Sequence, residues 1–233
     1  MPDASPKAVQ RSGAFAAKTS LPFPIAIPIA IPILMPPVTT ALIVANVAIY
    51  LLQSILPGLI GPFALWPLGA SQAVPGVGFY PWQLITYAFL HGSVLHLGLN
   101  MYALYMFGSP VEQVFGTRRY LIYYFVSVLT AAFTQIAFAL VTGNVYPTIG
   151  ASGGVFGLLL AYGKFFPNNR VMLLIPPIPM SARTLVFVYA AIELFLGVTG
   201  TQEGVAHFAH LGGLIGGWLL LKYWRGGPRR YPR

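Results

Sequence analysis

Six stretches of about twenty mainly apolar residues run through this chain, and they limit what it can fold into more than any other feature. Their ranges are 38–56, 94–115, 119–141, 148–166, 182–199 and 205–224. A helix of about 20 apolar residues is long enough to cross the hydrocarbon core of a bilayer. Only 7% of the 233 residues are charged, whereas a soluble domain carries about 25%. The sequence therefore predicts an all-α membrane protein with six transmembrane helices.

The basic residues predict how these helices are oriented. All 13 Lys and Arg residues lie at or beside alternate connections between the stretches, or in the two ends of the chain. This arrangement gathers them on one side of the membrane. Connections rich in Lys and Arg stay on the cytoplasmic side, so we expect both termini to be cytoplasmic. The net charge of +9 is thus explained by topology, and no nucleic-acid partner is expected.

Two segments outside the six stretches complete the predicted organisation. Residues 21–37 contain six prolines, which remove amide donors and break helices. We therefore interpret residues 1–37 as a Pro-rich cytoplasmic or interfacial tether. Residues 57–93 carry no charge and are rich in Gly, Pro, Trp and Tyr, and Trp and Tyr prefer the membrane interface. We expect a membrane-lying first loop there, within a six-span domain over 38–224 that is followed by a basic cytoplasmic tail over 225–233.

A few polar side chains fall at a similar depth in three of the predicted helices. The second stretch carries His96 and Asn100, the fourth carries Ser152 and the sixth carries His210. Each lies near the end that is expected on the outer side. Polar side chains are costly in lipid and usually face a bundle interior or a wet cavity. Their shared depth makes a common polar site one interpretation.

Paired glycines indicate how two of these helices meet. Gly153 and Gly157 form one G-x-x-x-G pattern, and Gly213 and Gly217 form another. Such patterns allow helix backbones to approach closely. If the two patterns face each other, the Ser152 hydroxyl meets an imidazole of the sixth stretch, and a serine nucleophile needs such a base. The residues alone leave a second interpretation open, in which Ser152 only packs between helices.

The same residues resemble the signatures of the rhomboid family of intramembrane serine proteases. G-x-S-G is present as Gly150, Ser152 and Gly153, H-x-x-x-x-H-x-x-x-N as His91, His96 and Asn100, A-H-x-x-H-x-x-G-x-x-x-G as Ala206, His207, His210, Gly213 and Gly217, and G-x-x-x-E-x-x-x-G as Gly108, Glu112 and Gly116. Each pattern alone is weak. Four patterns in the family's order are specific, and the resemblance covers about residues 38–224.

The resemblance implies a six-helix rhomboid-like bundle with the activity of a serine endopeptidase. Ser152 would be the nucleophile and His210 the base, in a dyad without a carboxylate. His96 and Asn100, with the Ser152 amide, would line the oxyanion hole. The residues expected to support this site are Gly150, Gly153, Phe156, His207, His91 and Glu112. The expected substrates are single-span membrane proteins, cut near the outer membrane boundary.

Two positions depart from the family pattern, and one acid lies outside it. Gln83 follows Trp82 where the family often has Arg, so we expect an Arg-dependent contact of the first loop to be missing. Phe156 replaces a frequent Tyr and can still pack on the imidazole of His210. Glu193, midway along the fifth stretch, is expected to be a protonated or hydrogen-bonded packing residue away from the depth of the dyad. A functional role for this carboxylate is the alternative.

The chain lacks the residues that other classes of intramembrane hydrolase need. The only aspartate is Asp3, there is no cysteine, and the zinc motif H-E-x-x-H is absent, so we expect neither a metal nor another cofactor. A Ser–Lys dyad is also not expected, because Lys164 lies about 18 Å along the helix from Ser152. The remaining alternative is a proteolytically inactive rhomboid-like protein that binds transmembrane helices. The expected partners are transmembrane substrates and the bilayer, and the expected location is a prokaryotic plasma (inner) membrane.

Overall fold

The computed structural model describes residues 35–172, 177–200 and 206–226. Most of these residues are helical, and one pair of short strands is present among the connecting segments. The prediction of an all-α fold is confirmed. Most of the predicted tether and of the basic tail, and the connection at 201–205, lie outside the described residues.

Long helices occupy the six predicted stretches. They are α1 (Pro37–Ile55), α7 (Thr117–Thr142), α8 (Ser152–Phe165), α9 (Ala182–Thr199) and α10 (His207–Gly226), with the second stretch divided into α5 (Val94–Ala103), the π-helical η3 (Leu104–Gly108) and α6 (Ser109–Phe115). Among the described residues, α1, α7 and α9 are long and apolar enough to cross a membrane. The count of six spans therefore stays a prediction.

The fourth predicted stretch begins later than expected. Helix α8 starts at Ser152, and the prediction of a helix from residue 148 is wrong. Gly150 has φ 122°, a conformation that a right-handed helix does not contain. The segment is held in place by the first loop instead, because Leu65 and Thr148 exchange two backbone hydrogen bonds and the Gly150 amide donates to the Tyr87 carbonyl over 2.9 Å. The short α8 thus begins inside the bundle.

The first loop contains short helices and is anchored by a glutamine. These helices are η1 (Pro57–Leu59), α2 (Ile60–Phe63), α3 (Ala70–Ala73), α4 (Gln83–Thr86) and η2 (Tyr87–Phe89). The Gln83 side chain is fully buried. It donates to the carbonyls of Pro62 and Gly78 and accepts from the Trp66 amide, at 2.9 to 3.2 Å. Gln83 therefore holds the loop together where the sequence predicted a missing contact.

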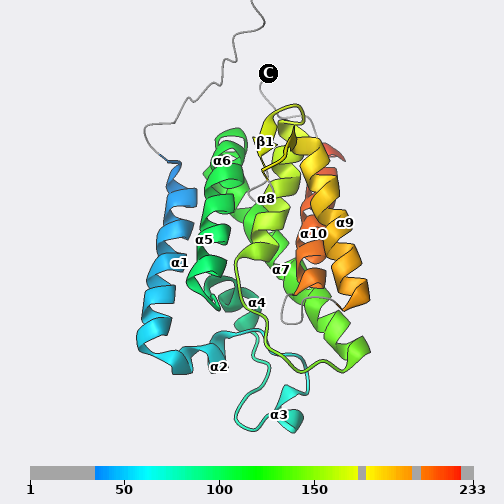
Figure 1. Cartoon of the computed structure of the whole chain (residues 1–233). Coiled ribbons are helices and arrows are strands. Elements are labelled where there is room, and N and C mark those ends of the chain that lie inside the picture. Colours follow the sequence, from blue (N-terminus) through cyan, green and yellow to red (C-terminus); the bar gives the residue numbers. More distant parts are fainter. Residues whose placement is uncertain (1–34, 173–176, 201–205, 227–233) are drawn as a thin grey trace, which may run out of the picture. The chain divides into compact units, whose positions relative to one another are not determined.

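A small hairpin, which the sequence did not predict, precedes α9. Strand β1 (Arg170–Met172) pairs antiparallel with β2 (Pro179–Ser181), with Val171 opposite Met180. Val171 is buried, so the hairpin closes one end of the helix bundle. This end lies opposite the short helices of the first loop (Figure 1).

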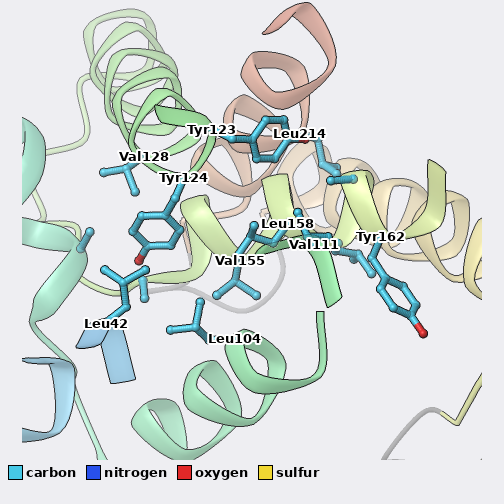
Figure 2. Close-up of a cluster of buried hydrophobic side chains, with 14 of the residues drawn as sticks. Leu42, Leu104, Val111, Tyr123, Tyr124, Val128, Val155, Leu158, Tyr162 and Leu214 are labelled. Atoms are coloured by element: carbon cyan, nitrogen blue, oxygen red, sulfur yellow. The ribbon is translucent and has the colours of Figure 1, made fainter. Parts of the chain in front are cut away.

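Helix α8 occupies the middle of the described bundle. It contacts α7, α9 and α10 as well as the α5–η3–α6 segment, and Figure 1 shows these elements around it. Its Val155 and Leu158 pack among buried side chains that include Leu104 of η3 and Tyr124 of α7 (Figure 2). Burial on all sides fixes the direction of α8 and therefore the position of its first residue, Ser152.

Candidate active site

Helices α8 and α10 touch through their glycines. A side-chain carbon added at Gly213 would overlap the Gly153 carbonyl, and one added at Gly217 would lie 3.4 Å from the Gly157 Cα. The two G-x-x-x-G patterns therefore face each other, as small-residue patterns do at close helix crossings. This contact brings the first residue of α8 beside the first turn of α10.

At this crossing the Ser152 hydroxyl meets an imidazole. The distance from Ser152 Oγ to His210 Nε2 is 2.7 Å, which is within the range of a hydrogen bond. The ring of Phe156 stacks on the His210 ring with centroids 4.4 Å apart and an interplanar angle of 5°. Phe156 lies one helical turn after Ser152, so one face of α8 supplies both the hydroxyl and the stacking ring.

The other ring nitrogen of His210 lies beside a carboxylate that the sequence analysis assigned elsewhere. Glu193 Oε2 is 2.9 Å from His210 Nδ1 and 2.6 Å from His207 Nδ1. The His207 contact has hydrogen-bond geometry, whereas the His210 contact has the distance but not the alignment. The prediction that Glu193 lies away from the depth of Ser152 and His210 is wrong.

A sequence signal for this contact exists in α9. Gly197 lies four residues after Glu193 and therefore shares its helical face. A side-chain carbon added at Gly197 would lie 3.2 Å from the His207 Cβ and 3.0 Å from the Phe208 ring. The glycine marks the face of α9 that meets α10, so it also indicates that Glu193 points at the histidines.

The predicted oxyanion residues lie on α5, across from Ser152. A side-chain carbon added at Gly150 would be 2.8 Å from His96 Nε2, so the glycine leaves room for this ring beside the start of α8. His96 Nδ1 accepts from the Gly92 amide over 3.4 Å, which leaves Nε2 as the nitrogen that carries the proton. Asn100 Nδ2 donates to the His96 carbonyl over 2.9 Å and has a second N–H available.

His91 packs against His96 and helps to hold its ring in place. It is fully buried and its ring meets the His96 ring edge-on, with centroids 5.0 Å apart. Its backbone is clamped by Gln53 of α1, which accepts from the His91 amide and donates to the His91 carbonyl. The position of the His96 ring therefore depends on packing that reaches back to α1.

One cavity joins these groups. Its volume is about 480 Å³, and its lining includes Ser152, His210, Glu193, His96 and Asn100. Most of the remaining lining is apolar, with Leu99, Met106, Phe107, Phe156, Leu159 and Leu185 among the lining residues. Concave, mostly apolar cavities with a few convergent polar groups are typical binding sites.

Comparisons with known proteins identify the family of the chain. Residues 78–225 match the Rhomboid domain family, which is more than half of the chain. The chain belongs to the rhomboid family. The resemblance seen in the sequence is thereby confirmed, and this rhomboid is an integral membrane protein.

Several matched relatives of this rhomboid are named as proteases. It is 33% identical over 138 residues to Rhomboid protease GluP of Bacillus subtilis, a match that covers 59% of the chain and 25% of that relative. It is 28% identical over 193 residues to Rhomboid protease GlpG of Yersinia enterocolitica, covering 81% of the chain and 62% of the relative. RHOMBOID-like protein 4 of Arabidopsis thaliana is 35% identical over 145 residues, covering 60% and 33%. The chain thus spans between a quarter and two thirds of these relatives.

Glu193 and its two histidines carry atoms that could bind a metal ion, and the distances between these atoms test whether they do. One donor atom each of Glu193, His207 and His210 lies within 4.8 Å of the others. Two ligands on one tetrahedral zinc stand about 3.3 Å apart, given Zn–N bonds of about 2.0–2.1 Å. Both contacts of Glu193 Oε2 are shorter. As folded, the two histidine nitrogens of the rhomboid stand closer to Glu193 Oε2 than two ligands of one zinc ion would, so this arrangement does not fit that metal.

Glu112, the last supporting residue of the rhomboid patterns, lies at a different place. Its carboxylate accepts from the Val38 amide over 3.0 Å, from the Thr39 amide over 2.7 Å and from the Thr39 hydroxyl over 2.8 Å. These amides begin α1, where Pro37 has no N–H to offer. Glu112 therefore caps α1 from α6, and it does not line the cavity.

Proposed function

We propose that this rhomboid is an intramembrane serine endopeptidase in which Ser152 is the nucleophile and His210 the general base. The observation that carries the proposal is the 2.7 Å contact from Ser152 Oγ to His210 Nε2 in the lining of a mostly apolar cavity. Matched relatives named rhomboid proteases support the same activity.

In the first half of the proposed reaction, His210 Nε2 takes the hydroxyl proton while Ser152 Oγ attacks the scissile carbonyl carbon. The tetrahedral intermediate collapses when His210 gives this proton to the leaving amine nitrogen, and an acyl-enzyme remains. In the second half a water molecule gives its proton to His210 and attacks the ester. When this second tetrahedral intermediate collapses, the bond from the acyl carbon to Ser152 Oγ breaks and His210 returns the proton to Oγ. The product leaves with a new carboxyl group, and the enzyme returns to its starting state.

The negative charge of the tetrahedral intermediate is proposed to be stabilised by hydrogen-bond donors of α5 and of the start of α8. The His96 Nε2–H faces the start of α8 past Gly150, and Asn100 has a free amide N–H. The first amides of α8, including that of Ser152, have no partner inside their own helix. Each such donor can lower the barrier by about 2.7–4 kcal/mol.

The proposed substrates are single-span membrane proteins, cut near the outer membrane boundary. A peptide inside a transmembrane helix has its backbone paired within that helix, so the scissile bond has to leave the helix before Ser152 can attack. The apolar lining of the cavity, with Leu159, Leu185 and Phe156, supports binding of apolar side chains of such an unwound segment.

The proposed topology keeps six spans over residues 38–224, with the tether and the tail on the cytoplasmic side of a prokaryotic inner membrane. Helices α1, α7 and α9 run in one direction, and α5–α6, α8 and α10 in the other (Figure 1). Arg119 at the start of α7 lies 5.7 Å from the Trp224 ring near the end of α10. This supports one basic side for the bundle, as positively charged connections require.

A fluorophosphonate probe tests the activity. The full-length protein in detergent micelles is expected to be labelled covalently and to cut a single-span substrate, whereas Ser152→Ala and His210→Asn lose cleavage by about 10³-fold or more. Ser109→Ala is the matched control, because Ser109 is a buried serine of α6 that does not line the cavity.

The inactive helix-binding alternative gives a different result. In that case the folded wild-type protein binds a transmembrane helix but is neither labelled nor able to cut it. Labelling that persists in Ser152→Ala would contradict the assignment of the nucleophile.

A further inference from the structure

We propose that Glu193 is a positioning residue that orients His210 of the proposed Ser152–His210 dyad from the side opposite the serine. This inference rests on the proposed function. His210 contacts both other groups, one through each ring nitrogen. Ser152 Oγ lies 2.7 Å from His210 Nε2, and Glu193 Oε2 lies 2.9 Å from His210 Nδ1.

Glu193 selects which nitrogen of His210 carries the proton. A neutral imidazole has one N–H and one lone pair, and an ionised carboxylate can only accept. The nitrogen that faces the carboxylate, Nδ1, is therefore the donor. Nε2 is left with its lone pair toward the Ser152 hydroxyl, which is the form that a general base needs.

The burial of Glu193 makes this selection strong. The glutamate is 8% exposed, and an ionised carboxylate without partners would be very costly there. Its Oε2 has two imidazole nitrogens within 2.9 Å, and both can donate. In a region shielded from water, a carboxylate at this distance also stabilises the positive charge that His210 acquires when it takes the serine proton.

His207 keeps Glu193 in place. Its Nδ1 lies 2.6 Å from the same oxygen with hydrogen-bond geometry, and the two histidine rings stand at 90° to each other. The aligned bond to His207 holds the carboxylate 2.9 Å from His210 Nδ1, and the proposal requires this second contact to align when His210 takes up the serine proton. During the reaction the Nδ1 proton stays on His210, and Glu193 does not take it up.

The stacking of Phe156 completes the restraint on His210. The phenyl ring lies parallel to the imidazole at 4.4 Å, so it controls the tilt of the ring plane. The carboxylate controls the rotation of the ring within that plane. Together with the serine contact, these two restraints limit how far the ring of the base can turn.

The test is Glu193→Gln in the full-length protein, which keeps the size of the side chain and removes its charge. The new amide can turn its NH₂ toward Nδ1 and force the proton onto Nε2. We expect kcat and the rate of fluorophosphonate labelling to fall by between about 10-fold and 10⁴-fold, the larger figure being the loss known for the same change in a serine-protease triad. KM for a single-span substrate should change by less than about threefold, because Glu193 is proposed to act on the reaction through His210 and not by binding the substrate.

Glu112→Gln is the matched control, because it makes the same change at the other buried glutamate of the bundle. It is expected to lower thermal stability and to leave the labelling rate per folded molecule within about threefold of the wild type. If Glu193→Gln is folded and its labelling rate and kcat also stay within threefold, the positioning role is wrong while the proposed function stands. If the wild type itself is neither labelled nor active, the proposed function fails first.

A second measurement needs no change at position 193. Nitrogen NMR of the wild type with ¹⁵N-labelled histidine reports which ring nitrogen carries the proton, and His210→Asn assigns the signal. A protonated Nδ1 and an unprotonated Nε2 support the proposal. A His210 ring protonated only at Nε2 overturns it, even if the Glu193→Gln protein does not fold.

Discussion

Two buried glutamates of this rhomboid contact different kinds of group. Glu112 is 4% exposed and Glu193 is 8% exposed, so both have lost most of their contact with water. Glu112 accepts from two backbone amides and a hydroxyl at the start of α1. Glu193 contacts two imidazoles at the start of α10.

The difference lies in whether the partners can change their protonation. Backbone amides keep their protons throughout any reaction, so the carboxylate of Glu112 can only hold α1 against α6. An imidazole that acts as a general base gains and loses a proton during the reaction, so the carboxylate of Glu193 would interact differently with the two states of His210. The first glutamate is suited to a fixed structure, and the second is suited to a reaction.

The largest effect is expected from Glu112→Ala. It leaves two amides and the Thr39 hydroxyl without their acceptor, and the loss of a helix cap together with unsatisfied donors should cost about 2–5 kcal/mol of stability. Thermal unfolding in detergent, followed by circular dichroism, measures it. If the melting temperature stays unchanged while labelling is lost, the two glutamates do not differ as we describe.

A smaller effect is expected from His207→Leu. This change removes the aligned 2.6 Å contact to Glu193, and a hydrogen bond to a charged group contributes about 1.5–3 kcal/mol. Since His207 does not touch Ser152, labelling should slow by less than about tenfold, well below the loss in Glu193→Gln. Labelling kinetics on the two folded variants compare them directly. A larger loss in His207→Leu would make His207, and not Glu193, the main support of His210.

The smallest effect is expected from Phe156→Leu. It removes the ring stacked on His210, and such ring pairs contribute about 0.5–1.5 kcal/mol beyond their buried area. We expect labelling to slow by about 2- to 10-fold with little change in melting temperature. Phe156→Tyr, which keeps the ring, is the control and should stay close to the wild type. Equal losses in both variants would mean that stacking does not restrain the base.

Much of the helix layout follows from local sequence. The fifth predicted stretch, 182–199, has the same bounds as α9, and the first is shifted by one residue from α1. Apolar runs and the glycines or prolines that end them act within a few residues, so they can be read directly. The start of α8 could not, because the Leu65–Thr148 pairing and the Tyr87 carbonyl that hold the preceding segment come from a loop far away in sequence.

The candidate site also has features that the sequence predicted and one that it did not. The i, i+4 spacing of His96 and Asn100 and the paired glycines of α8 and α10 predicted which helix faces meet, and the structure brings Ser152 and His210 together at that crossing. Counting residues from the ends of the stretches placed Glu193 at another depth. Helix packing and the length of the glutamate side chain carry its carboxylate to the histidines, and residue counting includes neither.

The sequence by itself determined that the chain is an all-α membrane protein and which faces of α8 and α10 carry reactive groups, because apolar length and helical periodicity are local properties. Only the tertiary structure decided which of the two buried glutamates lies beside the base. That outcome depends on how α9 packs against α10 around Gly197, and the packing of two helices is set by the shapes of both and not by the sequence of either one.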